Sequence, residues 1–118
     1  MAERIGYMDH ISLAVPDVPA QVDFFTEVMG MTAVRHSDEF GLVTDPESGF
    51  KIEIAKAEGS ETKFLHIGFQ VGSVDQAYEQ LTEAGLSTVH APHQRFANRT
   101  AFLRDAAGLE IQVSSPAA

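Results

Sequence analysis

The sequence contains no cysteine and no tryptophan, and its 118 residues include only 8 Lys and Arg against 17 Asp and Glu. Without cysteine there can be no disulfide bond, no thiolate nucleophile and no thiolate metal ligand. The formal net charge of −9 argues against non-specific binding to nucleic acids or anionic membranes, because both need clustered basic side chains. These absences leave a small molecule as the expected partner.

Long hydrophobic runs are missing too. No stretch of 18 apolar residues is present, so we expect no membrane span. The opening residues, MAERIGYMDH, lack the basic and then apolar pattern of a signal peptide. With 44% hydrophobic and 21% charged residues, the composition is typical of a globular domain. We therefore expect a cytoplasmic protein.

An internal repeat organises the chain. The strand-like segments 8–15 (MDHISLAV) and 64–71 (FLHIGFQV) carry a histidine at the same place, and the same offset of 56 positions aligns further residues beyond them. The aligned pairs are His10 with His66, Val15 with Val71, Val18 with Val74, Phe25 with Leu81, Thr26 with Thr82 and Glu27 with Glu83. We predict one domain, 1–118, made of two modules, 1–58 and 59–118, joined by the polar segment 56–63.

The spacing of apolar residues changes along each module in the same order, from a strand-like to a helical and back to a strand-like period. An alternating strand is followed by a helix, capped by Asp17 in the first module and by Ser73 in the second, and then by three shorter strands. The first helix is expected to carry an apolar stripe of Val18, Val22, Phe25 and Met29. The segment 90–99 contains Pro92 and no apolar period, which predicts a loop. The predicted fold class is α+β, with two tandem βαβββ modules forming a curved mixed sheet and helices on its outer face.

The sheet faces turned away from the helices carry polar side chains. His10 and His66 lie on this face of the first strand of each module, Glu53 lies on the last strand of module one, and Glu110 and Gln112 lie on the last strand of module two. Two imidazoles and two oxygen donors would suit a divalent metal ion with open coordination positions. The other interpretation is a solvated face of an antiparallel sheet.

The two βαβββ modules and the opening MDHISLAVPDVPAQVDFFTEVMGM resemble the vicinal-oxygen-chelate superfamily. This superfamily includes glyoxalase I, methylmalonyl-CoA epimerase, extradiol dioxygenases, fosfomycin-resistance enzymes and metal-free bleomycin-binding proteins. The resemblance covers essentially the whole chain, and the opening motif is specific to the superfamily but not to one activity. It implies that His10, Glu53 and His66 are metal ligands, since the family takes its ligands from the first and last strands of each module.

The resemblance also suggests the fourth ligand. The family's closing motif, similar to DPDGNxIEL, places a ligand glutamate four residues after the glycine. Gly49 is followed in this way by Glu53, whereas Gly108 is followed by Gln112. Gln112 is therefore the first choice, and Glu110, which lies on the same face, is the alternative.

The implied activity is that of a divalent-metal-dependent lyase or isomerase of the glyoxalase I type. Such an enzyme moves a proton next to a metal-chelated carbonyl or hydroxyl group of a small substrate. The implied base is Glu53, and the ion is nickel, zinc, cobalt, manganese or iron. Arg95, Arg99 and Arg104 are the candidate substrate-binding residues, and family members often form homodimers, which we expect here as well.

Two other functions remain open at this point. A bleomycin-resistance-type protein keeps the same fold but sequesters an antibiotic without any metal. An extradiol dioxygenase cleaves an aromatic ring with iron held by two histidines and one glutamate. The first of these would have no need for four ligand-like side chains.

Overall fold

The computed structural model describes residues 5–116, which form two compact units. The N-terminal unit is Asp9–Leu65, and the C-terminal unit contains residues 5–8 and 66–116. The units differ from the predicted modules in two ways, because residues 5–8 group with the second half of the chain and the boundary lies after Leu65 rather than after residue 58. Whether the whole chain behaves as one domain stays a prediction. Among the described residues no helix is long and apolar enough to cross a membrane.

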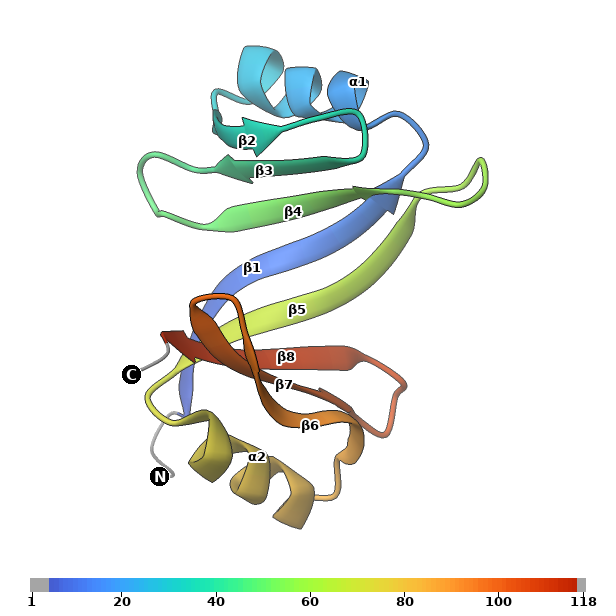
Figure 1. Cartoon of the computed structure of the whole chain (residues 1–118). Helices are drawn as coiled ribbons and strands as arrows, with labels where there is room; N and C mark the ends of the chain where they lie inside the picture. The colour runs from blue at the N-terminus through green and yellow to red at the C-terminus, as the bar shows by residue number, and fades with distance from the viewer. Residues whose placement is uncertain (1–4, 117–118) are drawn as a thin grey trace. The chain divides into compact units, whose positions relative to one another are not determined.

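The N-terminal unit has the order strand, helix and three strands (Figure 1). Its strands lie in the order β2-β3-β4-β1, with β4 parallel to β1 and antiparallel to β3. The elements are β1 (Gly6–Val15), α1 (Val18–Asp23), the π-helical segment η1 (Phe24–Val28), β2 (Thr32–His36), β3 (Phe40–Thr44) and β4 (Lys51–Lys56).

The C-terminal unit repeats this plan, with the strand order β5-β8-β7-β6 and with β8 parallel to β5 and antiparallel to β7. Its elements are β5 (Lys63–Val71), α2 (Val74–Glu83), β6 (Ser87–Arg95), β7 (Asn98–Arg104) and β8 (Glu110–Pro116). The predicted α+β class, with two βαβββ modules and mixed strand pairing, is confirmed.

The loop predicted at 90–99 is wrong, because this segment forms the end of β6 and the start of β7. The two strands pair as an antiparallel hairpin whose last pair is Arg95 with Asn98. The pairing register shifts between His90 and His93, around Pro92. Proline is tolerated there because β6 is the outermost strand in the order of its unit.

Capping side chains begin both helices as predicted. Asp17 accepts a hydrogen bond from the backbone of Ala20 at 3.1 Å, and Ser73 accepts one from the backbone of Gln76 at 3.2 Å. The predicted apolar stripe of the first helix is only partly right. The chain widens into η1 after Asp23, which changes the residue period, and Met29 is exposed rather than packed.

Each helix covers the apolar face of the sheet in its own unit. In the N-terminal unit Val18 and Val22 pack with Val43 and Ile54. In the C-terminal unit the corresponding core contains Val74, Ala77, Ala101, Leu103 and Val113. Because strand side chains alternate between faces, the residues between these core positions point away from the helices. That second face carries the candidate functional residues.

Gly6 marks a close backbone approach in the C-terminal unit. A Cβ at this position would collide with the backbone oxygen of Gln70 and lie 2.9 Å from a methyl group of Val71. We expect Gly6→Ala to lower the free energy of unfolding by about 1–3 kcal/mol, as overpacking does. Chemical denaturation would measure the loss. Gly59→Ala is the control, because a Cβ there meets no atom within 4 Å, and an equal loss in both variants would contradict the prediction.

Candidate functional site

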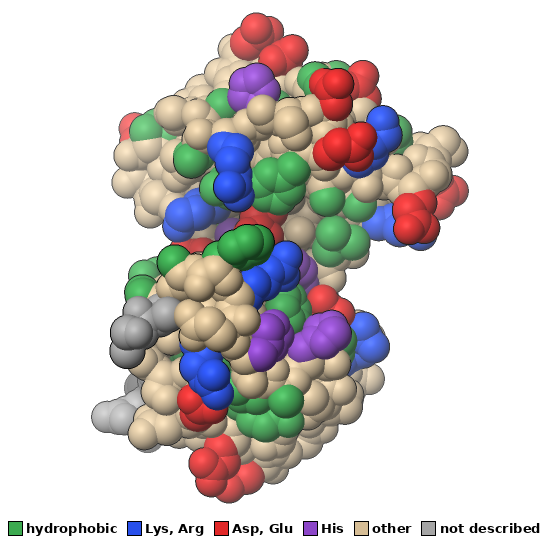
Figure 2. All heavy atoms as spheres, in the orientation of Figure 1, with side chains coloured by type: hydrophobic (Ala, Val, Ile, Leu, Met, Phe, Trp, Pro, Cys, Tyr) green, Lys and Arg blue, Asp and Glu red, His purple; other side chains and the backbone are tan. Residues whose placement is uncertain are grey.

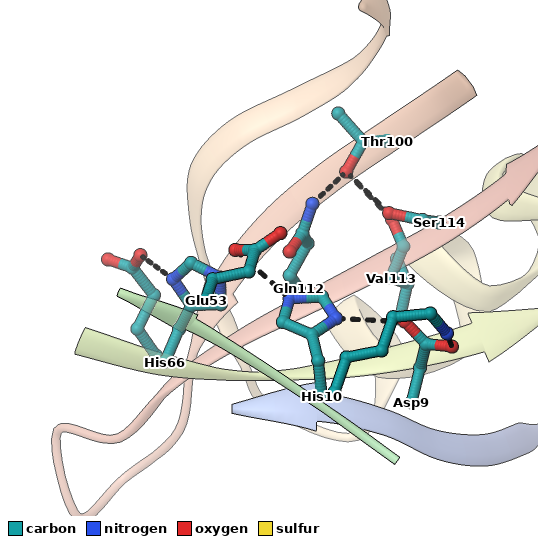
Figure 3. Close-up of polar contacts among 10 residues, drawn as sticks. Asp9, His10, Glu53, His66, Thr100, Gln112, Val113 and Ser114 are labelled. Carbon is teal, nitrogen blue, oxygen red and sulfur yellow. Dashed lines mark hydrogen bonds and ion pairs between the residues drawn. The ribbon is translucent and has the colours of Figure 1, made fainter. Parts of the chain in front are cut away.

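In the N-terminal unit, β1 and β4 bring His10 and Glu53 together. The strands are parallel and Ser12 pairs with Glu53, so His10 and Glu53 share one sheet face. His10 Nε2 lies 3.5 Å from Glu53 Oε1 (Figure 3). The two side chains differ in access to solvent, with 8% of the imidazole and 34% of the carboxylate side chain exposed.

Asp9 fixes the other edge of the His10 ring. Its Oδ2 lies 2.9 Å from His10 Nδ1, and its Oδ1 accepts a hydrogen bond from Lys51 Nζ at 3.0 Å. Burial alone would raise the pKa of Asp9, but the hydrogen bonds from His10 and Lys51 and the charge of Lys51 outweigh it and lower the pKa. An ionised Asp9 can accept a proton from Nδ1, and the Nε2 atom on the other edge of the ring, the one nearest Glu53, would then be the nitrogen that offers a lone pair to a metal ion.

The distance between His10 and Glu53 fits two ligands of one metal ion. A tetrahedral ion with bonds of about 2.0–2.1 Å would hold neighbouring ligand atoms about 3.4 Å apart, close to the 3.5 Å observed. A histidine whose second nitrogen is bound by a carboxylate is the usual arrangement around protein-bound metals. The donor types and the spacing of this half of the site therefore fit a divalent ion.

In the C-terminal unit, Gln112 takes the place that Glu53 has in the N-terminal unit. Gly68 on β5 pairs with Gln112 on β8 in the same way that Ser12 pairs with Glu53. His66 lies two residues before Gly68 on the same strand, as His10 lies two residues before Ser12. The repeat seen in the sequence thus extends to the strand register.

Glu110 has partners of its own in this unit. Its Oε1 lies 3.1 Å from Arg104 Nη2, and its Oε2 lies 3.9 Å from His66 Nδ1. The second distance is too long for a hydrogen bond, but it places a carboxylate on the Nδ1 side of His66, as Asp9 is on the Nδ1 side of His10. The ring of Phe102 packs edge-on against His66, with the centroids 5.5 Å apart.

The three candidate substrate-binding arginines each contact a neighbouring side chain. Arg99 forms two hydrogen bonds of 2.8 Å to Asp75, which lower the pKa of Asp75 and raise that of Arg99. Arg104 pairs with Glu110, and Arg95 lies over the ring of Phe96. Acidic and basic side chains are interspersed on the face seen in Figure 2. A role for these arginines in substrate binding stays a prediction.

The sequence reasoning did not identify two residues that support the candidate ligands. Asp9 is adjacent to His10 in the sequence, so the Asp-His pair was a usable signal. Thr100, which contacts Gln112, had no such signal, because their proximity depends on the pairing of β7 with β8.

A family model described as the Glyoxalase/Bleomycin resistance protein/Dioxygenase superfamily matches residues 7–113. No curated protein matches the chain.

Several solved structures have the same fold. Methylmalonyl-CoA epimerase from Mycobacterium tuberculosis matches with a TM-score of 0.80 and 21% identity, covering 100% of this chain and 93% of that one. A hypothetical protein from Bacillus halodurans matches with a TM-score of 0.78 and 18% identity over 98% and 97% of the two chains. A variant of Streptomyces coelicolor methylmalonyl-CoA epimerase in complex with 2-nitronate-propionyl-CoA matches with a TM-score of 0.75 and 18% identity, over 98% and 100%.

Proposed function

Since the chain belongs to the Glyoxalase/Bleomycin resistance protein/Dioxygenase superfamily, we propose that it is a divalent-metal-dependent isomerase or lyase. In this proposal it moves a proton on the carbon next to a metal-bound oxygen of a small substrate. The observation that carries the proposal is the geometry of His10. Its Nδ1 is bound by Asp9, and its Nε2 lies 3.5 Å from the carboxylate of Glu53.

The proposed ligands come from both halves of the repeat. In this proposal His10, Glu53 and His66 supply two imidazole nitrogens and a carboxylate oxygen, donor types that suit a divalent ion. Gln112 is the proposed fourth ligand, through its amide oxygen, because its strand register matches that of Glu53. Glu110 is less suited, because its carboxylate already pairs with Arg104. A set of nitrogen and oxygen donors suits nickel, zinc, cobalt, manganese or ferrous iron.

The proposed chemistry divides between the ion and the side chains. A bound divalent ion would stabilise negative charge on the substrate oxygen while the neighbouring carbon loses its proton. Glu53 is the proposed base, since it is partly exposed and a substrate can reach it. Asp9 and Lys51 keep the His10 ring in one orientation. Return of the proton to the opposite face of the carbon would give the epimer, whereas return to the face that lost it would regenerate the substrate.

The names of the similar structures support a proposed substrate class. Methylmalonyl-CoA epimerases act on a thioester with an acidic hydrogen next to the carbonyl, so a 2-substituted acyl-CoA thioester is the first candidate. The hemithioacetal used by enzymes of the glyoxalase I type is the second. Both present a carbonyl or hydroxyl oxygen beside the carbon that exchanges its proton.

Metal analysis and proton exchange together test this function. We expect untagged protein to bind about one equivalent of a divalent ion and, once loaded, to introduce deuterium from D₂O into methylmalonyl-CoA or into the hemithioacetal of methylglyoxal and glutathione. Mass spectrometry measures the exchange, and metal-free protein is the control. Protein that takes up none of the five metals and catalyses no exchange would overturn the proposal. Calorimetry with bleomycin would then test the metal-free binding function.

A further inference from the structure

The hydroxyl group of Thr100 on β7 makes three hydrogen-bond contacts, one of them with Gln112. Its hydroxyl group contacts the backbone oxygen of Val113 at 3.1 Å, the hydroxyl of Ser114 at 3.1 Å and the amide nitrogen of Gln112 at 3.0 Å (Figure 3). Thr100 is only 1% exposed, so water does not compete for these contacts.

The directions of these hydrogen bonds follow from the donors and acceptors available. A carbonyl oxygen can only accept, so the single proton of the Thr100 hydroxyl is donated to Val113. The hydroxyl oxygen then has two lone pairs left, which accept from Ser114 and from Gln112. An amide oxygen of Gln112 turned toward Thr100 would meet another acceptor.

From this network we infer that Thr100 is a positioning residue that fixes the orientation of the Gln112 amide. With its nitrogen held by Thr100, the amide directs its oxygen away from Thr100, and only the oxygen can ligate a divalent ion. An amide that rotated by 180° would present NH₂, which repels a cation and lacks a lone pair for it. This inference rests on the proposed metal-binding function, and it explains why a neutral glutamine can occupy the place of a glutamate.

Because the hydroxyl group of Thr100 holds the Gln112 amide in this inference, two variants of Thr100 should differ in metal affinity. Thr100→Val keeps the shape of the side chain but removes the hydroxyl, whereas Thr100→Ser keeps the hydroxyl. We expect Thr100→Val to weaken Co²⁺ binding about 10- to 100-fold, the usual effect of losing a residue that orients a ligand. Thr100→Ser should bind Co²⁺ nearly as tightly as the wild type.

A double-mutant cycle with Gln112→Ala separates this role from a general effect on packing. Co²⁺ affinity would be measured by competition with a chelator for all four proteins, together with the thermal stability of each metal-free form. If Thr100 acts through Gln112, adding Thr100→Val to Gln112→Ala should change the affinity no further. Nuclear magnetic resonance of the metal-free protein provides a second measurement, since the side-chain NH₂ of Gln112 should exchange slowly in the wild type and faster in Thr100→Val.

The outcomes separate the inference from the proposed function. If the wild type binds no Co²⁺, nickel, zinc, manganese or ferrous iron, the proposed function fails and the inference with it. If the wild type binds Co²⁺ and Thr100→Val binds it equally well, only the inference fails. The same holds if Thr100→Val weakens binding equally with and without Gln112.

Discussion

Replacing Glu53 by glutamine should lower turnover by about 10²–10⁴-fold, the range expected when a general base is lost. The amide keeps an oxygen at the same position, so the variant should still bind a divalent ion, though more weakly. The fold should survive, because glutamine keeps the size of the glutamate side chain and 34% of the Glu53 side chain is exposed. The measurements are the exchange rate of the metal-loaded protein, its metal content and its thermal stability.

Glu47→Gln is the matched control for this variant. Glu47 is an exposed glutamate in the turn before β4, and its replacement should leave exchange and metal content unchanged. Full exchange activity in Glu53→Gln would exclude Glu53 as the base. Loss of metal in proportion to the loss of exchange would instead assign Glu53 a purely ligating role.

The sequence predicted the elements of this fold well because each has a clear local cause. Alternation around His10 and His66 indicates strands, and Asp17 and Ser73 indicate the starts of the helices. In the structure these strands and caps are present. The strand register then extends the repeat to Glu53 and Gln112, which the glycine spacing had already aligned.

Other features were not predictable because they depend on contacts between distant segments. The widening of the first helix into η1 leaves no mark in the apolar spacing of its sequence, so Met29 was assigned to the packed stripe although it is exposed. Pro92 suggested a loop, but an outer strand can accommodate it. The contact of Thr100 with Gln112 joins two strands and could not be read from either.

In the candidate site too, some features can be read from the local sequence and others depend on contacts between distant segments. The residue types of His10, Glu53 and His66 are evident from the sequence, whereas the support behind them is not. Lys51 holds Asp9 behind His10, and Arg104 holds Glu110 beside His66. Lys51 and Glu110 occupy matching places on β4 and β8, but Lys51 is the cation of the first pair and Glu110 is the carboxylate of the second. The two pairs are therefore built from non-equivalent positions of the repeat. The similar surroundings of the two histidines are therefore not simply inherited from the duplication.

Replacing His66 by alanine is expected to abolish metal binding, with an affinity loss of at least about 100-fold, because a first-sphere ligand contributes more than the residues that orient it. The content should fall from about one ion per chain to none, as measured by elemental analysis after dialysis. His36→Ala is the control, since His36 is an exposed histidine on β2, and it should retain the ion. Thermal unfolding of the metal-free forms would report the separate cost of losing the contact between His66 and Phe102.

The number of metal ions bound per chain also tests whether both halves of the repeat share one ion. If one ion is shared by both halves of the repeat, His66→Ala and His10→Ala should each remove all of the metal. If each half bound its own ion, the wild type would hold two and each variant would keep one. An unchanged metal content in His66→Ala, with the ion lost in His10→Ala, would restrict the site to the N-terminal unit. The pair of histidines that first revealed the repeat would then have one member that binds metal and one that only packs against Phe102.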